Sequence, residues 1–367
     1  MIWDIPKSLK GVKTMGRDKV RIGIIGVGSI SHAHIQAYRQ LPHVELVAAC
    51  DINAERAEKV AKHYGISHVY ADYNEMFKEI ELDGVSVCTW NNGHAPATIA
   101  ALKAGVNVLC EKPLALNAQE AQTMVDVAQA TGKLLMVGFV RRFDENAQFL
   151  KSIIEQGDLG KIYYAKTGCI RRCGNPGGWF SDKKRSGGGP LIDLGVHIID
   201  LVWFLMGKPK AVSAVGSTFN YIGSRSHVKG ISWYKSADYS DYNDVEDSAV
   251  AMVKFDNGAT VFVETSWTQN IKQDHLYLEL YGSKAGATLE PQLQIMGEKN
   301  GYLVDWAPKI DASGSFQEIF NKEIAHFVDC ILNGTPCLSP GVDGLEIMKI
   351  LDAIYKSAET GREVTIS

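Results

Sequence analysis

The chain has 367 residues, of which 46% are hydrophobic and 22% charged, and its formal net charge is −4. This composition is typical of a globular protein, the length allows two domains, and the acidic balance disfavours binding to nucleic acid or to an anionic membrane surface. No segment approaches the ~18 consecutive apolar residues of a membrane span, because the best candidate, 198–206, contains Asp200.

The seven cysteines show no close-spaced framework, which indicates reduced thiols rather than disulfides. The only near pair, Cys169 and Cys173, has no second pair and no neighbouring histidine, so we expect no metal site. The N-terminal residues show no basic region followed by an apolar one. We therefore expect a cytoplasmic protein.

The segment 20–31, Val-Arg-Ile-Gly-Ile-Ile-Gly-Val-Gly-Ser-Ile-Ser, joins a short apolar strand to the start of a helix. Its spacing indicates a dinucleotide-binding βαβ unit. Gly26 would supply the tight turn, and Gly28 would let a pyrophosphate approach the backbone. The N–H groups at the helix start, next to Ser29 and Ile30, would then face the phosphates.

A second strand, 44–50, ends at Asp51, about 23 residues past Gly28. This separation is near the ~20 residues expected for the acid that binds the adenosine ribose, and Ile52 would lie beside the same group. A carboxylate there repels a 2′-phosphate, so the pattern favours NAD over NADP, although Arg56 keeps the use of both open. The alternative is that Asp51 only caps the next helix.

From residue 20 onward, strand and helix patterns alternate, which predicts a doubly wound, mostly parallel sheet of the Rossmann type. We expect its strands at 22–25, 44–50, 68–70, 84–89, 106–110 and 134–137, and its helices at 33–41, 54–64, 73–80, 95–104 and 117–131.

The pattern changes near residue 141 to that of an α+β domain with a large, open and mostly antiparallel sheet. We expect a helix at 144–156, strands at 161–168, 210–219, 246–255, 259–267, 276–281 and 301–306, and helices at 315–332 and 344–357. The turn Asp-Asn-Gly at 256–258 indicates a hairpin. The predicted organisation is an N-terminal arm (1–19), a nucleotide-binding domain (20–142), and a substrate-binding and oligomerisation domain (143–367).

Lys112 is the first candidate for a catalytic role. It follows the predicted strand 106–110 in the sequence Glu-Lys-Pro, so it would lie at the carboxyl edge of the sheet, where ligands of such sheets bind. A lysine there could stabilise the alkoxide that develops when a substrate hydroxyl is oxidised. Most lysines are solvated surface residues, and that alternative stays open.

A glycine-rich segment, 186–189, leads into a helix in which Asp193 and His197 are four residues apart and share one face. His197 could accept the hydroxyl proton, and Asp193 could bind a substrate hydroxyl or orient the imidazole. The same spacing also fits a hydrogen-bonded pair that only stabilises the helix. Asp200 is a further possible partner of His197.

These motifs, taken in order, resemble the glucose–fructose oxidoreductase / inositol dehydrogenase family (Gfo/Idh/MocA), from about residue 20 to the C-terminus. The resemblance rests on Gly26-Val27-Gly28, Thr89-Trp90-Asn91 with His94, Glu111-Lys112-Pro113, Gly-Phe-Val-Arg-Arg-Phe at 138–143, and 193–197. It implies a Rossmann domain followed by an α/β domain whose open sheet forms homodimers, homotetramers or larger assemblies. It also implies NAD(P)-dependent oxidation or reduction of a secondary alcohol on a sugar, an inositol or a related polyol.

The resemblance further implies roles for single residues. Lys112 is the lysine of the Glu-Lys-Pro motif, Asp193 the substrate-binding acid and His197 the proton-transferring histidine. It places Arg142 near the nicotinamide ribose or phosphate. It also places four residues along the nicotinamide side of the crevice: Thr89, Asn91, His94 and Glu111.

Two departures from the family pattern leave the catalytic groups intact. Ser31 replaces the usual glycine or alanine. Trp90 occupies a position at which proline is common, and its indole could narrow the crevice or stack on the cofactor. On the substrate side, Arg171 could contact a hydroxyl, phosphate or carboxylate. Trp179 could stack on a sugar or merely pin its own loop, and the loop 234–242 could cap the site or meet a neighbouring subunit.

The sequence therefore predicts an NAD-dependent dehydrogenase acting on a secondary ring hydroxyl of a sugar, glycoside or inositol, without nucleic-acid or membrane partners. One alternative is a glycoside hydrolase or lyase that retains NAD and uses transient ring oxidation. Another is a non-catalytic regulator that senses NAD or sugar, which the intact Lys112, Asp193 and His197 disfavour.

Overall fold

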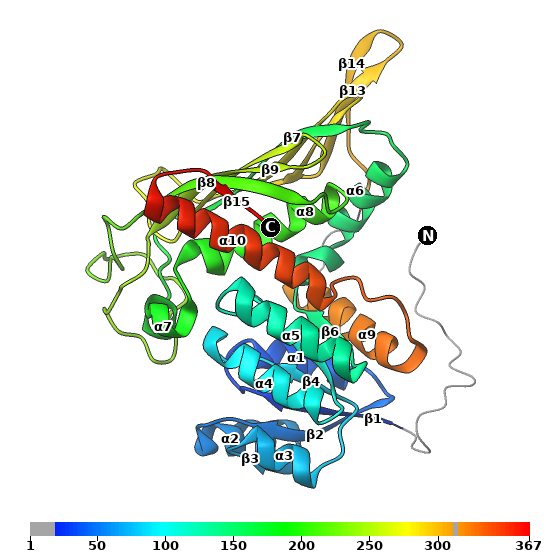
Figure 1. Ribbon diagram of the computed structural model, residues 1–367, viewed down its shortest axis with the longest axis vertical. Helices are drawn as coiled ribbons and strands as arrows, with labels where there is room; N and C mark the ends of the chain where they lie inside the picture. Colours follow the sequence, from blue (N-terminus) through cyan, green and yellow to red (C-terminus); the bar gives the residue numbers. More distant parts are fainter. Residues whose placement is uncertain (1–18, 311–314) are drawn as a thin grey trace.

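The computed structural model describes residues 19–310 and 315–367, so the predicted arm, apart from Lys19, lies outside the described residues. The described chain forms two sheets with helices between and around them (Figure 1).

The first sheet has six parallel strands in the order β3-β2-β1-β4-β5-β6. This is the order of a doubly wound dinucleotide-binding fold, and its strand order reverses between β1 and β4. The predicted Rossmann architecture is confirmed. The strands are β1 Val20–Ile25, β2 Val44–Cys50, β3 His68–Tyr70, β4 Gly84–Val87, β5 Asn107–Cys110 and β6 Leu135–Val137.

Helices connect successive strands of this sheet because parallel strands need crossover connections. They are α1 Ser31–Arg39, α2 Ala54–Tyr64, α3 Tyr73–Glu79, α4 Asn91–Lys103 and α5 Ala118–Thr131. Helix α4 begins at Asn91, four residues before its predicted start, and carries Pro96 inside it. The motif that contains Asn91 and His94 is therefore helical.

The second sheet has nine strands in the order β14-β13-β12-β11-β7-β10-β9-β8-β15. Neighbouring strands are antiparallel except β7 and β10, which confirms the predicted mostly antiparallel sheet. The strands are β7 Ile162–Ile170, β8 Ala211–Phe219, β9 Ser248–Phe255, β10 Thr260–Ser266, β11 His275–Gly282, β12 Gly286–Glu290, β13 Gln294–Lys299, β14 Tyr302–Trp306 and β15 Val364–Thr365. Sequence patterns missed β12, β13 and β15, and the β13–β14 hairpin projects from the body of the molecule (Figure 1).

Helices α8 and α10 lie on the side of this sheet that faces the first domain (Figure 1). The helices of this part are α6 Glu145–Glu155, α7 Lys183–Ser186, α8 Val196–Leu205, α9 Phe316–Asn333 and α10 Gly341–Thr360, with short turns η1 Val140–Phe143, η2 Gly178–Ser181 and η3 Leu191–Gly195. On the opposite face, Val215 and Met252 pair across β8 and β9 and are 40% and 42% exposed. Val215 and Met252 thus form an exposed apolar pair on this face, next to the ion pair of Lys254 with Glu363.

Helix α9 returns to the first domain although its sequence lies near the C-terminus. Phe327 and Val328 share a buried cluster with Ile22 and Ile24 of β1, and α9 packs along α1. The polypeptide therefore passes three times between the two halves, after β6, into α9, and again into α10 and β15, so the halves are held together by more than the segment after β6.

One helical stretch among the described residues, Lys183–Leu205, is long and apolar enough to cross a membrane by length and composition alone. Its most apolar window is 89% buried inside the protein. The stretch is therefore a core segment of the fold.

Candidate active site

The glycine turn after β1 has the geometry of a phosphate-binding turn. Gly26 has φ +83°, and a Cβ there would lie 2.6 Å from the backbone nitrogen of Thr89, so only glycine fits. A Cβ on Gly28 would meet no described atom within 4 Å, and the N-cap residue of α1, Ile30, makes no side-chain cap. Ser31 donates a hydrogen bond to the Gly28 carbonyl at 2.6 Å and so stabilises the turn. The open side of Gly28 and the uncapped helix start fit a pyrophosphate.

Asp51 lies beside this turn and is 5% exposed. Its carboxylate accepts the N–H groups of Val27 at 2.9 Å and Asn53 at 2.8 Å, and it forms a two-pronged ion pair with Arg56. Asn53, rather than Asp51, caps α2, so the capping alternative for Asp51 is wrong. Ile52 is 82% exposed next to this pair, which fits a surface against which an adenosine could lie.

Lys112 and Asp193 form an ion pair where the two domains meet. The Lys112 Nζ donates to the Asp193 Oδ1 at 3.0 Å and to the Asp193 carbonyl at 3.0 Å, and the peptide bond between Lys112 and Pro113 is cis. Trp267, just past β10, donates its Nε1–H to the other carboxylate oxygen at 3.0 Å. Burial opposes ionisation of Asp193, but the Lys112 charge and these hydrogen bonds outweigh it and lower the pKa of Asp193.

His197 is the second residue of α8, and its imidazole makes no hydrogen bond to any described residue. The interpretations in which Asp193 or Asp200 holds the imidazole are therefore wrong. A π-helical turn, η3, carries Asp193 into α8, and the Asp193 carboxylate is already bonded to Lys112 and Trp267. His197 is left free to meet a substrate.

The protonation state of His197 follows from its surroundings. Burial, and then the positive charges of Lys112, Arg141 and Arg171, lower the pKa of His197 well below its usual value. The imidazole is therefore neutral near pH 7, which is the form that accepts a proton.

The prediction that Arg142 contacts the cofactor is wrong. Its side chain is 0% exposed, and its guanidinium bonds Asp200 at 2.5 and 3.0 Å, Asp343 at 2.5 Å and the Leu338 carbonyl at 2.7 Å. Burial opposes the charge, but Asp200 and Asp343 outweigh it and raise the pKa of Arg142. Arg142 joins three segments of the chain and does not face the crevice.

Other side chains expected on the nicotinamide side are turned into the protein. Asn91 donates to a backbone carbonyl of the glycine-rich segment at 2.7 Å, and the Nδ1 of His94 lies 2.7 Å from a carbonyl of the Glu-Lys-Pro motif. Glu111 bonds the Nε2 of His34 at 2.8 Å, and the Thr89 hydroxyl donates to the next residue's carbonyl at 3.0 Å. These hydrogen bonds hold the strand ends in place. A cofactor bound here would therefore contact the backbone of these residues rather than their side chains.

Aromatic rings form one wall beside the Lys112–Asp193 pair. Trp90 and Trp179 are near-parallel, with centroids 6.4 Å apart, and Trp179 lies 3.9 Å from Phe180. Phe180 meets Trp267 edge-on at 6.4 Å. Nothing local to Phe180 or Trp267 in the sequence indicates that their rings meet.

The loop before β9 reaches across the crevice. The hydroxyl of Tyr234 lies 3.3 Å from that of Ser29 in the glycine turn, and Asp238 pairs with Arg185 at 2.8 Å. Of the two interpretations of this loop, capping the site agrees with these contacts.

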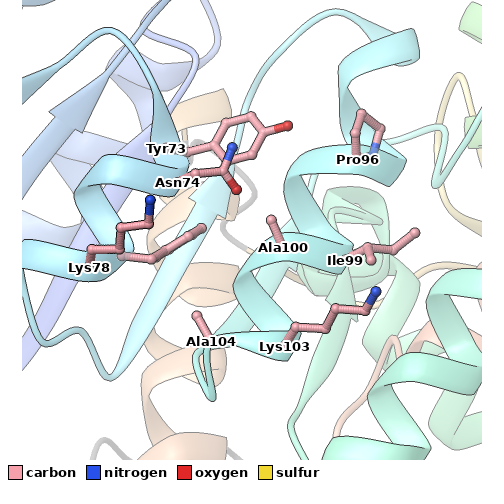
Figure 2. A pocket seen from close by; sticks show the side chains of 9 residues that line it. Tyr73, Asn74, Lys78, Pro96, Ile99, Ala100, Lys103 and Ala104 are labelled. Carbon is pink, nitrogen blue, oxygen red and sulfur yellow. The ribbon is translucent and has the colours of Figure 1, made fainter.

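Two hollows of the described residues differ in their relation to the site. One, of about 500 Å³, lies between α3 and α4, is lined by Lys78 and Lys103 among others, and contains none of the candidate catalytic residues (Figure 2). The other, of about 420 Å³, is lined by 171–174, 231–234 and Asp274. Only the second includes predicted site residues.

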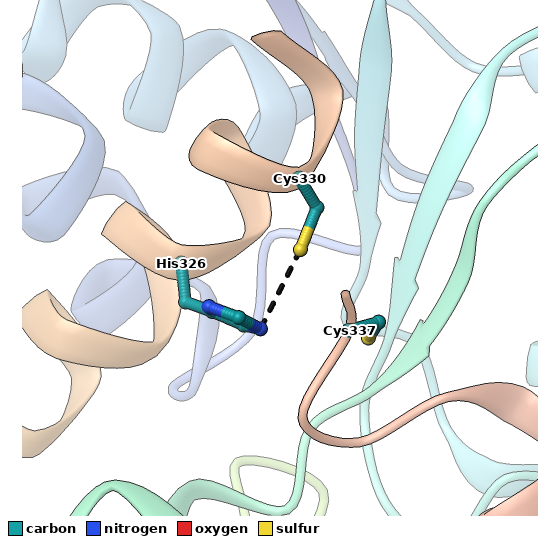
Figure 3. A group of neighbouring side chains, drawn as sticks. All are labelled: His326, Cys330 and Cys337. Carbon is teal, nitrogen blue, oxygen red and sulfur yellow. Dashed lines mark hydrogen bonds between the residues drawn. The ribbon is translucent and has the colours of Figure 1, made fainter. Parts of the chain in front are cut away.

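The structure also brings together His326, Cys330 and Cys337, which sequence reasoning did not single out (Figure 3). Their ligand atoms all lie within 4.8 Å of one another, although the His326 Nε2 already accepts the N–H of Leu338 at 2.9 Å. The first two are one turn apart on α9, a spacing visible in the sequence, while Cys337 joins them from the following loop.

Comparison with known proteins covers nearly the whole chain. Residues 20–139 match the oxidoreductase family, NAD-binding Rossmann fold, and residues 151–366 match the C-terminal alpha/beta domain of the same oxidoreductase family. A D-glucoside 3-dehydrogenase of Escherichia coli (strain K12) is 34% identical over 355 residues, which cover 96% of this chain and 99% of that protein. A myo-inositol 2-dehydrogenase of Thermotoga maritima is 27% identical, with 95% and 98% covered. The crystal structure of an oxidoreductase domain protein from Kribbella flavida superimposes with a TM-score of 0.84 at 25% identity, and covers 96% of this chain and 100% of that one.

Proposed function

The chain belongs to the Gfo/Idh/MocA family of NAD-dependent oxidoreductases acting on CH–OH groups, and from that premise we propose that it oxidises a secondary ring hydroxyl of a glycoside. Free sugars and inositols are the other substrates within the proposal. The observation that carries it is the neutral, unpartnered imidazole of His197 beside the Lys112–Asp193 pair. The relative named D-glucoside 3-dehydrogenase supports a glycoside and oxidation at ring carbon 3.

Each of the three residues has a distinct part in the proposed reaction. His197 takes the proton of the substrate hydroxyl. An ammonium has three N–H groups, and Lys112 uses two on Asp193, so the third can stabilise the oxygen as it becomes anionic. The Asp193 carboxylate is held in place by Lys112 and Trp267, and it can accept a hydrogen bond from a neighbouring hydroxyl of the substrate. Bound NAD supplies the hydride acceptor.

The test is NADH formation with a panel of aryl glucosides, free aldoses and inositols, repeated with NADP. We expect aryl glucosides with NAD to react fastest. Lys112→Met and His197→Asn should each lower kcat by about 10²–10³-fold. Lys103→Met, on the exposed side of α4, is the matched control and should keep wild-type rates. Wild-type rates in Lys112→Met would refute the assigned chemistry.

A second candidate is an enzyme that retains NAD through turnover and oxidises its substrate only transiently. The contact between Tyr234 and Ser29 favours it, because the loop that carries Tyr234 lies against the glycine turn where the phosphates would sit. Purified protein would then carry NAD in a one-to-one ratio after denaturation and turn over without added NAD. Loss of NAD on desalting, together with a strict need for added NAD, would exclude this candidate.

We further propose a homo-oligomer formed through the open face that contains Val215 and Met252, and a cytoplasmic location. The exposed apolar pair on that face supports the oligomer interface. Met252→Lys should dissociate the assembly in a light-scattering measurement, and an unchanged mass would contradict the interface.

A further inference from the structure

The hollow lined by 171–174, 231–234 and Asp274 is connected to the reacting residues through two aromatic rings, Phe180 and Trp267. Its Tyr234 packs edge-on against Phe180 at 6.2 Å, and Phe180 in turn meets Trp267, which holds Asp193. On its other side, a Cβ on Gly174 would lie 3.6 Å from the Trp267 carbonyl. A substituent that extends from a substrate ring held at Asp193 past these rings could therefore reach the hollow.

Arg171 connects the hollow to the catalytic groups. It lines the hollow. Burial raises the pKa of Asp193, which Lys112 and then the Arg171 charge lower. For His197, burial, Lys112 and Arg141 have the larger effects, and the Arg171 charge lowers the pKa further. The aliphatic stem of Arg171 packs over Gly174, where a Cβ would meet it at 2.9 Å. Its guanidinium makes no ion pair or hydrogen bond with any described residue, so a partly buried cation without a partner among the described residues lines the hollow.

The surrounding charges are mostly positive, although the whole chain has a net charge of −4. The Arg172 guanidinium donates to the Lys272 carbonyl at 3.1 Å, and Arg225 donates to the Arg172 carbonyl at 2.9 Å. Neither forms an ion pair with a carboxylate of the described residues. Asp274 is the one acid among the lining residues, and it accepts the backbone N–H of Arg172 at 2.8 Å.

The remaining wall is apolar and aromatic. Ile231 is 47% exposed and Tyr234 53%, and the indole of Trp233 is fixed by a hydrogen bond from its Nε1–H to the Asn175 carbonyl at 2.8 Å. Such a wall suits a flat or apolar part of a ligand. An anionic group carried on that part could then bind the guanidinium groups.

We propose that this hollow binds an anionic group, carboxylate or phosphate, carried on the anomeric substituent of the substrate, so that the enzyme prefers acidic glycosides to neutral ones. The proposal rests on the proposed dehydrogenase function. Arg171 is its central residue, because an unpaired guanidinium gains most from a carboxylate or phosphate partner.

The test compares three glucosides that share one phenyl ring: the 4-carboxylate, the 4-phosphate and the neutral 4-carboxamide. The carboxamide matches the carboxylate in shape, so their kcat/KM ratio isolates charge. We expect a ratio of at least about tenfold at low salt, falling as salt is added. The anionic glucoside with the higher kcat/KM shows whether the hollow prefers a carboxylate or a phosphate.

Arg171→Gln should bring the carboxylate-to-carboxamide ratio close to one. Lys229→Gln removes an exposed charge from the loop before β9, which also contributes 231–234 to the hollow, but Lys229 does not line the hollow; this variant should keep the wild-type ratio. Equal kcat/KM for acid and amide in the wild type overturns the inference but leaves the proposed function intact. A ratio that survives Arg171→Gln overturns the assigned site.

Calorimetric binding of the carboxylate and carboxamide in the presence of NAD separates this inference from the proposed function. If neither compound is oxidised, and no member of the panel of glucosides, free aldoses and inositols is either, the proposed function fails. Tighter binding of the acid, lost in Arg171→Gln, would then still support the subsite, and equal binding would refute it.

Discussion

Replacing Arg142 by methionine tests whether this residue stabilises the junction between the domains or contacts NAD. The side chain is 0% exposed and its guanidinium bonds Asp200, Asp343 and a backbone carbonyl. Methionine fills part of the volume but leaves Asp200, whose side chain is 2% exposed, without its cation. We therefore expect a large loss of stability.

The size of the loss follows from these contacts. Removing one partner of a buried ion pair costs about 3–5 kcal/mol, because the remaining charge stays buried and uncompensated. Asp343 keeps an ion pair with Lys208, so only one of the two carboxylates is orphaned. We expect a decrease of about 3–4 kcal/mol in the free energy of unfolding, with an unchanged Kd for NAD in the folded protein.

The measurement is urea unfolding followed by tryptophan fluorescence, together with calorimetric titration of NAD under native conditions. The control is Arg142→Met combined with Asp200→Asn, which removes the orphaned charge and should recover part of the lost stability. Unchanged unfolding together with a tenfold weaker Kd for NAD would refute the structural role and restore a cofactor contact.

Three further predictions concern the two binding regions and the cysteine cluster. Gly28→Ala should weaken NAD binding without lowering the Tm, because its Cβ enters space that no described atom occupies; unchanged NAD affinity would contradict a pyrophosphate there. Arg171→Gln removes a charge that disfavours protonation of His197, so the pKa of His197 rises and the acid limb of the kcat/KM profile for a neutral glucoside shifts to higher pH. If the acid limb of the profile stays at its wild-type pH, the charge of Arg171 has no effect on the pKa of His197. A hydrogen bond with Cys330 lowers the pKa of Cys337 to about 6, so iodoacetamide at pH 7 should label Cys337 before the other cysteines, and more slowly after Cys330→Ala. Peptide mass spectrometry measures the order.

Local patterns were sufficient for the first domain. Its strands are short apolar runs separated by helices, and consecutive elements of this kind pack as neighbours, so the parallel sheet could be predicted. The glycine turn and Asp51 lie on consecutive strands, and β1 and β2 pair directly. The same reasoning placed Lys112 at a strand end and found the segment with Asp193 and His197.

Short strands in the second sheet were harder to predict. β12 and β13 lie between turns, and β15 has only two residues, so none shows a clear alternation of apolar and polar residues. Their place in the sheet depends on hydrogen bonds to neighbours rather than on their own sequence.

Tertiary structure alone decided which partners the candidate catalytic side chains have. Trp267 bonds Asp193 from 74 residues away, and Arg142 bonds Asp343 from 201 residues away. No local periodicity encodes such pairs, and a side chain named by a motif can be bound inside the protein, as Arg142 is, or left free, as His197 is. The sequence by itself therefore determined the Rossmann fold and the candidate residues for catalysis, whereas long-range packing decided which of them are bonded inside the protein and which remain without a partner among the described residues.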